Sequence, residues 1–568
     1  MNFKEHESAA KLRGGYYTDP DIALFLSTWA TERSHESVLE PSCGDGVFFE
    51  ALRLAGARAV GRLLACETDE IEAVKARKRA SRLFPAAQVD VINSDFIGWF
   101  LHEVNRGPQF DAVVGNPPFI RYQYLEEALQ RRFEKLFSLL GVPFTRHTNA
   151  WVPFVLASVA LLKPGGRLAM VVPAELLHVL HTTGLRRYLL DTCQQVLVLD
   201  PVDLWFDGTL QGIVLLLAEK RAQDDQRPTR LGVVGVASRR LLAREPQHFV
   251  ETADWVSRDE VNGKWMLALL TAKERDLLKR LEQTRGVHRL CQLADVDVGI
   301  VTGANKFFLV NDEVVTRFDL QPYAHPMFGR SEHVPGVIYD ETVHAANRRA
   351  GMPTNFLWFG DAPRNRLPQQ ARRYIEQGEA EQLHLRYKCR IRNPWYNVPS
   401  VYRTPVAMLK RSHDFPRLVW NPLGAFTTDT AYRIRVKPDV PQAALVFAFV
   451  TSLTALTAEL EGRHYGGGVL ELVPSEIERL LVALPSRRRP ALLGLDGAFR
   501  RKQQPSEILE HQDNEILRKV GLTSLESETL LSAWQRLRNR RHRESGDIED
   551  ERQSMVSTKG LPVLAEGA

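Results

Sequence analysis

The chain has 568 residues, of which 44% are hydrophobic and 25% are charged. This composition is typical of a globular protein with several domains, and it excludes a mainly disordered chain, a collagen-like fibre and a small disulfide scaffold. The 74 Lys and Arg against 69 Asp and Glu give a net charge of only +5, which is too weak to indicate a polyanionic partner by itself. There is no long uncharged apolar run and no apolar core in residues 1–11, so we expect neither a membrane span nor a signal sequence. The five cysteines form no CxxC pair, which favours reduced thiols in a cytoplasmic protein.

Short apolar runs alternate with helical patterns between residues 37 and 220. Lys163-Pro164-Gly165-Gly166 is typical of a turn that ends a helix and leads into a strand. The alternation predicts an α/β fold with a doubly wound, mostly parallel sheet, and we expect this first domain to cover residues 1–222. The expected helices are 47–54, 70–83 and 151–162, and the expected strands are 37–40, 63–68, 89–93, 110–114, 168–172, 196–200 and 212–218.

Three segments of different character follow. Residues 223–285 begin with a polar stretch and end in a helical pattern, which predicts a connecting segment with a helix. Residues 286–485 combine short apolar runs with many Gly, Pro and aromatic residues, which predicts an irregular α+β domain. Residues 486–568 form a charged tail, in which we expect a helix at 524–537 and a partly disordered end.

A cofactor site is indicated at the ends of the first three strands. Gly44 and Gly46 lie between a strand and a helix, where glycine lets the backbone turn tightly and approach a ligand. Glu67 ends the next strand, where a carboxylate can accept hydrogen bonds from ribose hydroxyls. Asp95 and Phe96 end the third strand, where an acid and a ring can hold an adenine. The alternative is a generic strand–turn–helix with chance acids. Because acids line the site and the Lys-Ser/Thr of a phosphate loop is missing, a cationic nucleoside cofactor fits better than a pyrophosphate.

The tetrapeptide Asn116-Pro117-Pro118-Phe119 ends the fourth strand. An exocyclic amine on an aromatic ring is a poor nucleophile because its lone pair is delocalised into the ring. The side-chain oxygen of Asn116 and the carbonyl of Pro117 can accept its hydrogens and pull the nitrogen toward tetrahedral geometry. The prolines fix that carbonyl, and Phe119 offers a face for a planar base. A simple strand-terminating turn is the alternative, but the position after three cofactor elements favours the catalytic interpretation.

The order of these motifs resembles that of the γ-class adenine-N6 DNA methyltransferases, with a layout similar to the TaqI type of type II restriction-modification methylase. The resemblance implies a class I S-adenosylmethionine-dependent methyltransferase domain, which is a Rossmann-like doubly wound sheet, in residues 1–222. It also implies an irregular α+β target-recognition domain in residues 286–485. The motifs that carry it are Gly14-Gly15-Tyr16-Tyr17-Thr18-Asp19-Pro20, Glu40–Gly46, Glu67, Asp95-Phe96, Asn116–Phe119 and, in the second half, residues 297–308 and 465–472.

The resemblance assigns S-adenosylmethionine as the cofactor and gives each motif a role. Thr18, Glu40 and the loop with Gly44 and Gly46 would surround its methionine part. Glu67 would hold the ribose, and Asp95 with Phe96 would hold the adenine. The target base would contact Phe206, a second aromatic, together with Pro118 and Phe119. We assign no general base, because proton loss is expected to follow methyl transfer, and we expect no metal site.

The implied reaction is methylation of an adenine N6 amine in double-stranded DNA, with the base flipped out of the duplex. Basic residues alternate with other residues at Arg386, Lys388, Arg390 and Arg392. In a strand these basic side chains would share one face and could neutralise phosphates. A solvated face is the alternative for this stretch. For the whole chain the alternatives are methylation of RNA adenine or of a protein glutamine amide, and a catalytically silent DNA-binding subunit. The large second domain favours DNA.

We expect a methylase without a fused nuclease. The first motif starts at Gly14, and no convincing nuclease cluster follows the core motifs. The chain would then act beside a separate restriction endonuclease, in another phage-defence system, or alone.

Overall fold

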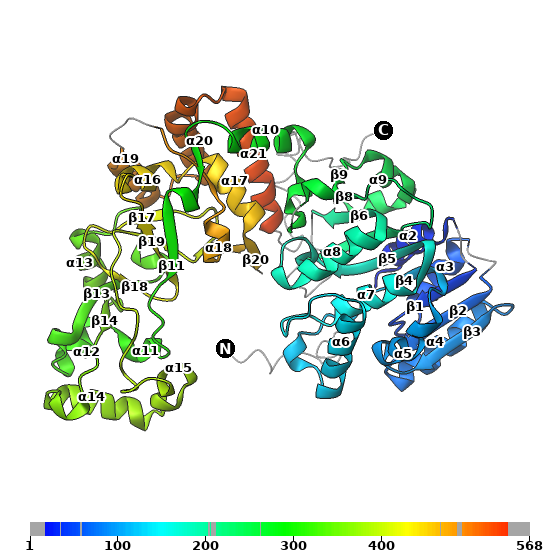
Figure 1. The fold of residues 1–568 in the computed structure, drawn as a ribbon, viewed down its shortest axis with the longest axis horizontal. Helices are drawn as coiled ribbons and strands as arrows, with labels where there is room; N and C mark the ends of the chain where they lie inside the picture. Colours follow the sequence, from blue (N-terminus) through cyan, green and yellow to red (C-terminus); the bar gives the residue numbers. More distant parts are fainter. Residues whose placement is uncertain are drawn as a thin grey trace. The chain divides into compact units, whose positions relative to one another are not determined.

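The computed structural model describes residues 18–33, 36–56, 60–202, 205, 212–261, 263–465, 467–485 and 491–542. The described residues form two compact units (Figure 1). Unit 1 contains the described residues up to Lys273 together with His542, and unit 2 is Glu274–Arg541.

Unit 1 is built on a nine-stranded sheet with the order β3-β2-β1-β4-β5-β7-β6-β8-β9 (Figure 1). The first five strands pair in parallel, whereas β7 is antiparallel to both of its neighbours. The strand order therefore reverses between β1 and β4, which is the point at which open α/β sheets bind ligands. The bounds are β1 Ser37–Glu40, β2 Arg62–Glu67, β3 Gln88–Asn93, β4 Phe110–Gly115, β5 Leu162–Pro173, β6 Cys193–Pro201, β7 Ile213–Lys220, β8 Arg230–Val236 and β9 Val256–Ser257.

Helices pack on the sheet of unit 1 and bury it. Four of them, α2, α3, α4 and α9, share one apolar core with alternate strand residues such as Val38 and Leu63. Another group, α5, α7 and α8, makes contacts with one another and with the sheet outside that core. This is the doubly wound arrangement expected from the sequence. The bounds are α2 Pro20–Thr31, α3 Val47–Leu54, α4 Glu70–Leu83, α5 Phe96–Glu103, α6 Glu127–Leu139, α7 Trp151–Leu161, α8 Thr183–Thr192 and α9 Pro246–Thr252.

Two parts of unit 1 differ from the sequence-based expectation. Residues 163–166 lie inside β5 rather than in a turn, and the register with β4 shifts there, from Phe110 opposite Leu162 to Ala112 opposite Arg167. The extra residues form an irregularity that Gly165 accommodates at φ 77°. The segment expected to connect two domains contains β8, which pairs in parallel with β6 along its whole length. The sheet thus continues past residue 222.

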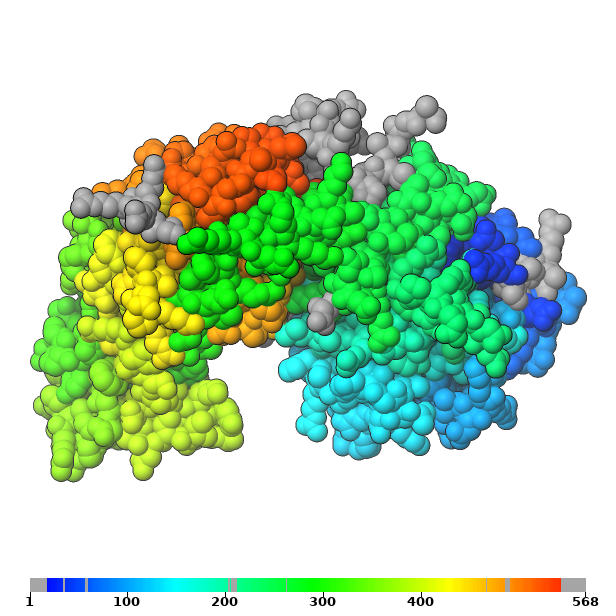
Figure 2. All heavy atoms as spheres, turned by 45° about the horizontal axis from the view of Figure 1, so that its top comes forward, coloured from blue at the N-terminus to red at the C-terminus, as the bar shows by residue number. Residues whose placement is uncertain are grey.

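Unit 2 is an irregular α+β structure, as predicted. Short strands form a two-stranded sheet, two four-stranded sheets and a three-stranded sheet among the described residues. Two apolar cores hold them together, and a yellow-green segment that includes α14 and α15 lies at the surface (Figure 2). The strands are β10 Val287–Arg289, β11 Ala294–Val298, β12 Leu309–Val310, β13 Ala324–Phe328, β14 Asn355–Leu357, β15 Val406–Leu409, β16 Arg411–Ser412, β17 Leu418–Trp420, β18 Phe426–Thr427, β19 Ala431–Val436, β20 Arg463–Tyr465, β21 Val469–Glu471 and β22 Leu481–Ala483.

The helices of unit 2 include three from the segment that we expected to form a separate tail. Residues 491–541 contribute α19, α20 and α21, and α21 packs against α17 and α20. Trp534 of α21 is buried, with its ring 5.8 Å from that of Phe415. The bounds are α10 Ala272–Glu282, α11 Asn305–Phe308, α12 Asp312–Arg317, α13 Glu341–Arg349, α14 Gln369–Ala380, α15 Tyr387–Arg390, α16 Gln442–Ala448, α17 Ser452–Glu461, α18 Pro474–Ile477, α19 Leu492–Arg500, α20 Pro505–Ile516 and α21 Ser524–Arg541.

Within the described residues, no single helix has both the length and the apolar character needed to cross a bilayer. Only α16 and α17 taken together pass such a test, across a bend of 77°. Both are largely buried in unit 2.

Candidate active site

The candidate site lies at the carboxyl edge of the unit 1 sheet. Glu40 is the last residue of β1, Glu67 is the last of β2, and Asn116 directly follows β4. Since β1 pairs in parallel with both β2 and β4, these three residues lie at the same edge, across the switch point of the sheet. The fold therefore brings the predicted cofactor acids and the predicted catalytic turn together.

The loop between β1 and α3 turns through two glycines with positive φ. Gly46, at φ 92°, precedes α3, and a Cβ atom there would lie 2.6 Å from the Phe49 ring. Gly44, at φ 52°, has open space where a Cβ would stand. The Cys43 N–H donates to the Cys66 carbonyl at 3.0 Å, which fixes the loop to β2. Gly46 thus shapes the turn, while Gly44 leaves backbone that a ligand can approach.

The carboxylates around this loop make it acidic. Glu67 accepts from the Gly44 N–H at 2.9 Å and from the Asp69 N–H at 2.8 Å, so its position is fixed. Glu40 is almost completely buried, and its Oε2 atom has no hydrogen-bond partner within the described residues. Burial raises the pKa of Glu40 well above its usual value, and the charges of Glu67 and Asp45 raise it further. A cation bound at this edge would offset that repulsion, so the residues present fit a positively charged ligand.

The turn that contains Asn116 is held from two sides. Its Nδ2 atom donates to Thr18 Oγ at 3.2 Å, and its backbone carbonyl accepts from Ser42 Oγ at 3.1 Å. A Cβ atom at Gly115 would lie 3.3 Å from Pro41 Cδ, so the turn is packed closely against the start of the glycine loop. Thr18 is itself buried. These contacts orient the amide, because the nitrogen end is committed to the threonine hydroxyl.

The remaining residues of the turn differ in exposure. Pro117 is buried, whereas Pro118 and Phe119 are half-buried. Phe119 packs against the core of unit 1, as does Trp205, the neighbour of Phe206 in the chain. Phe206 lies outside the described residues, as does the part of the first motif before Thr18.

Asp95 and Phe96 have structural contacts that sequence reasoning did not anticipate. Asp95 caps α5, with its side chain accepting from Ile97 N and Gly98 N, and it pairs with Arg132 at 2.9 Å. The Phe96 ring is buried against the rings of Trp99 and Phe154. Their assignment to the adenine of a cofactor stays a prediction.

Sequence reasoning also missed two residues that act on the site residues. Ser42 holds the carbonyl of Asn116, and Arg132 of α6 pairs with Asp95. Ser42 stands beside the glycine loop in the sequence, so its position gave a signal. Arg132 is 37 residues from Asp95 along the chain and gave none.

The basic stretch in unit 2 is not a strand, so the condition under which its cations would share one face is not met. Tyr387–Arg390 is a single helical turn, α15, and its cations do not share one face. The Arg392 guanidinium donates to the carbonyls of Thr302 and Val301, each at 2.7 Å, so it holds the loop after β11 rather than projecting freely. The other predicted phosphate contacts, Arg386, Lys388 and Arg390, are exposed.

Comparison with known proteins identifies the family. Residues 62–202 match the model of the Eco57I restriction-modification methylase, and residues 262–517 match the C-terminal domain of the type II methyltransferase M.Eco57I. The chain is 21% identical to the type II methyltransferase M.AccI of Acinetobacter calcoaceticus, over 82% of this chain and 84% of that protein. It is 23% identical to M.XamI of Xanthomonas campestris pv. amaranthicola, over 83% and 85% of the two chains.

A solved structure shows the same fold. The type IIL restriction-modification enzyme MmeI, determined in complex with DNA, is similar with a TM-score of 0.51 and 12% identity, over 90% of this chain and 73% of that chain. Unit 1 therefore has a doubly wound α/β fold, in agreement with its strand order. With both methylase models matched in order along the chain, this protein belongs to the type II restriction-modification methylases.

Proposed function

We propose that the chain transfers a methyl group from S-adenosylmethionine to the N6 amine of an adenine that has been flipped out of double-stranded DNA. The observation that carries the proposal is the Asn116 turn, which Thr18 and Ser42 hold beside the glycine loop and its carboxylates. This transfer requires a hydrogen-bond acceptor for the hydrogens of the amine, placed next to a site that attracts a cationic cofactor. The relatives are named as type II methyltransferases, and the similar enzyme MmeI was determined in complex with DNA, which supports DNA as the substrate.

The acidic edge would hold the cofactor. Glu67 would accept from the ribose hydroxyls, and the Gly44 backbone would pass beside the ligand. Glu67 and Asp45 supply the negative charge that raises the pKa of Glu40, and this charge suits a sulfonium or ammonium group. When bound, S-adenosylmethionine supplies a methyl group on a positively charged sulfur.

The chain's own residues would make the amine reactive. Asn116 Oδ1 and the Pro117 carbonyl accept the two amine hydrogens, which returns lone-pair density to the nitrogen. Phe119, with Pro118 beside it, contacts the face of the extruded base. The amine nitrogen held in this way would accept the methyl group that S-adenosylmethionine supplies, with the cofactor's sulfur leaving as a neutral thioether, and the amine would then lose a proton to water. Phe206 and the exposed Arg386, Lys388 and Arg390 are proposed as further contacts to the base and to phosphates. We infer a role in DNA defence beside a separate restriction endonuclease.

The direct test is tritium transfer from labelled S-adenosylmethionine, followed by nucleoside chromatography. We expect label in N6-methyladenine when duplex DNA is supplied, and none when RNA or protein is supplied. Label confined to N4-methylcytosine, RNA or protein glutamine would contradict the proposal.

A matched pair of asparagine variants assigns the chemistry to the turn. Asn116→Ala removes the acceptor, and we expect methyl transfer to fall by about a hundredfold or more with DNA binding retained. Asn105→Ala changes an exposed asparagine of unit 1 and should leave transfer unchanged. Unchanged turnover in Asn116→Ala would refute the assigned role.

A further inference from the structure

Three large apolar side chains gather on the surface of unit 2 at α15. Leu385, Tyr387 and Ile391 expose 57%, 63% and 62% of their surface, within seven residues of the chain. Exposed apolar residues that stand singly need no explanation, but a group of this kind marks an interaction site. We call Tyr387, Ile391, Lys388 and Arg390 the α15 ridge.

The side chains of this helical turn point in different directions. Tyr387 and Ile391 are four residues apart and lie on the same side of the turn, whereas Cys389 points the opposite way and is buried. Lys388 and Arg390 flank the tyrosine, with their charged groups 5.7 and 5.6 Å from the centre of its ring. The α15 ridge thus combines an exposed aromatic ring with two nearby cations.

The ridge is fixed to the loop that follows β11. Arg392 donates to the carbonyls of Val301 and Thr302, as described above. At Gly303, where φ is 80°, a Cβ atom would lie 2.8 Å from Lys388 Cβ and 3.2 Å from Cys389 Sγ. The loop backbone at Gly303 thus packs closely against the side chains of Lys388 and Cys389, which holds the α15 ridge in its exposed position.

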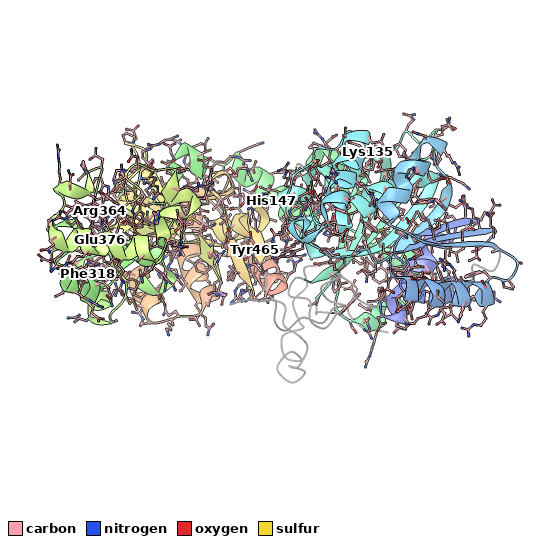
Figure 3. The ribbon with its side chains drawn as sticks, turned by 90° about the horizontal axis from the view of Figure 1, so that it is seen from below. Lys135, His147, Phe318, Arg364, Glu376 and Tyr465 are labelled. Atoms are coloured by element: carbon pink, nitrogen blue, oxygen red, sulfur yellow. The ribbon has the colours of Figure 1, made fainter. Side chains whose placement is uncertain are left out.

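The charge of the ridge is not compensated within the described part of the chain. Lys388 and Arg390 form no ion pair with any carboxylate of the described residues. Arg364 of the same unit shows the contrast, because it pairs with Glu376 at 2.6 Å and with Glu379 at 2.9 Å (Figure 3). A partner that offers both negative charge and flat apolar surface would complement the ridge.

Unpaired DNA bases with their phosphates meet both conditions. We propose that Tyr387 and Ile391 stack against bases where a DNA duplex is opened, while Lys388 and Arg390 hold the adjoining phosphates. The inference rests on the proposed function, since extrusion of a target base is what would open the duplex. Stacking of a base on an aromatic side chain needs no particular sequence, because every base has a flat face.

The test measures binding without cofactor and without methyl transfer. One probe is a short, fully paired fluorescent duplex, and the other is the same duplex with an internal stretch of unpaired thymines. The full chain, Tyr387→Ala, Ile391→Ser, Lys388→Ala with Arg390→Ala, and Leu525→Ala are titrated with each probe. Leu525 is an apolar residue of unit 2 that exposes 72% of its surface, and it serves as the control.

We expect Tyr387→Ala to weaken binding of the unpaired probe by about tenfold, with a smaller loss for Ile391→Ser and little change for the paired duplex. The double charge variant should weaken binding of both probes and lower the slope of log affinity against log salt by about two. Leu525→Ala should change neither.

Equal effects of Tyr387→Ala on the two probes, or no effect on either, would overturn the proposal. A changed oligomeric state of Tyr387→Ala, with DNA binding unaltered, would overturn it in favour of a protein interface. Because no methyl group is transferred in this assay, failure of the ridge and failure of the proposed function give different results.

Discussion

A few contacts at single residues decide what the candidate site can do. The Nδ2 atom of Asn116 donates a hydrogen bond to the Thr18 hydroxyl, and this contact helps to set the orientation of the amide. An amide whose nitrogen pointed toward the substrate amine would repel its hydrogens instead of accepting them. Thr18 is therefore a positioning residue whose effect is exerted through Asn116.

Replacing Thr18 by valine keeps the shape of this buried side chain and removes the acceptor. We expect kcat for methyl transfer to fall by about tenfold, which corresponds to one lost hydrogen bond. Thr18→Ser should restore most of the activity, because the hydroxyl returns. Steady-state kinetics of the three proteins checks this, and equal activity of the valine and wild-type proteins would remove Thr18 from the mechanism.

The two glycines of the loop should respond differently to alanine. Gly46→Ala meets both a positive φ and a contact of 2.6 Å with the Phe49 ring, so we expect a loss of about 2 kcal/mol or more in the free energy of unfolding. Gly44→Ala meets only the positive φ and should cost about 1 kcal/mol. Gly44→Ala should instead weaken cofactor binding, because the alanine Cβ would enter the open space beside the loop. Denaturant unfolding and calorimetric titration separate the two effects, and the reverse ranking of stabilities would contradict this account.

Residue types and spacing were enough to predict which side chains meet at the sheet edge, because the ends of parallel strands must share it. They were not enough to predict which of those groups are already engaged. Asp95 caps a helix and forms an ion pair with Arg132, whereas Arg392 donates hydrogen bonds to backbone carbonyls of the loop after β11. The ion pair and the hydrogen bonds from Arg392 involve residues that are distant in the sequence.

Elements with strong local signals were predicted well. The expected helix at 70–83 has the bounds of α4, because Asp69 caps its first turn and alanines recur on its buried side. The basic stretch at 386–392 shows the opposite case. Alternating basic residues over a few positions are compatible with both a strand and one turn of helix. The packing of Cys389 against the Gly303 loop favours the helix.

A buried acid in α20 gives unit 2 a pH dependence. Asp513 accepts from the Ser452 N–H at 2.9 Å, and burial raises its pKa to about 7. In the unfolded chain the group ionises near its ordinary pKa of 3.8. The folded protein therefore retains a proton that the unfolded chain has released, and stability falls as the pH rises from about 4 to about 7.

The variant Asp513→Asn keeps an acceptor for Ser452 and cannot ionise. We expect it to be more stable than wild type above about pH 7, by up to about 4 kcal/mol at 1.36 kcal/mol per unit of pKa. The two proteins should approach equal stability near about pH 4. Thermal unfolding at a series of pH values tests this, and parallel curves for the two proteins would show that Asp513 does not titrate as stated.

At the scale of the whole molecule, the sequence did not reveal how far each unit extends. The segment after residue 222 begins with a polar stretch that looks like a linker, yet β8 pairs with β6 and lengthens the sheet. The charged C-terminal region likewise looks like a solvated tail. Its arginines instead pair with acids from remote parts of unit 2, Arg536 with Glu274 and Arg538 with Asp414. Pairings over such separations cannot be read from local composition.

The end of α21 makes the most deeply buried of these pairs among the described residues. Arg541 and Glu459 of α17 are bonded at 2.7 Å with both side chains fully buried. Burial alone would raise the pKa of Glu459, but the charge of Arg541 and hydrogen bonds from His464 and Arg541 lower it to about 2. The ionised pair thus stabilises the fold at pH values above the ordinary pKa of glutamate. That contribution to stability is lost as the pH falls toward about 2.

Arg541→Met should leave the Glu459 carboxylate buried without its principal counter-charge. We expect a loss of about 3–5 kcal/mol in the free energy of unfolding, whereas Arg541→Met combined with Glu459→Gln should recover a large part of it. Arg538→Met is the matched control, since its pair with Asp414 is partly exposed and should be worth less than about 1 kcal/mol. Hydrogen exchange of peptides from α17 and α21 would locate the change, with faster exchange in both helices for Arg541→Met alone. If Arg538→Met and Arg541→Met cost the same, burial would not be what makes this contact strong, and the C-terminal helix would be held to unit 2 by its apolar face around Trp534 instead.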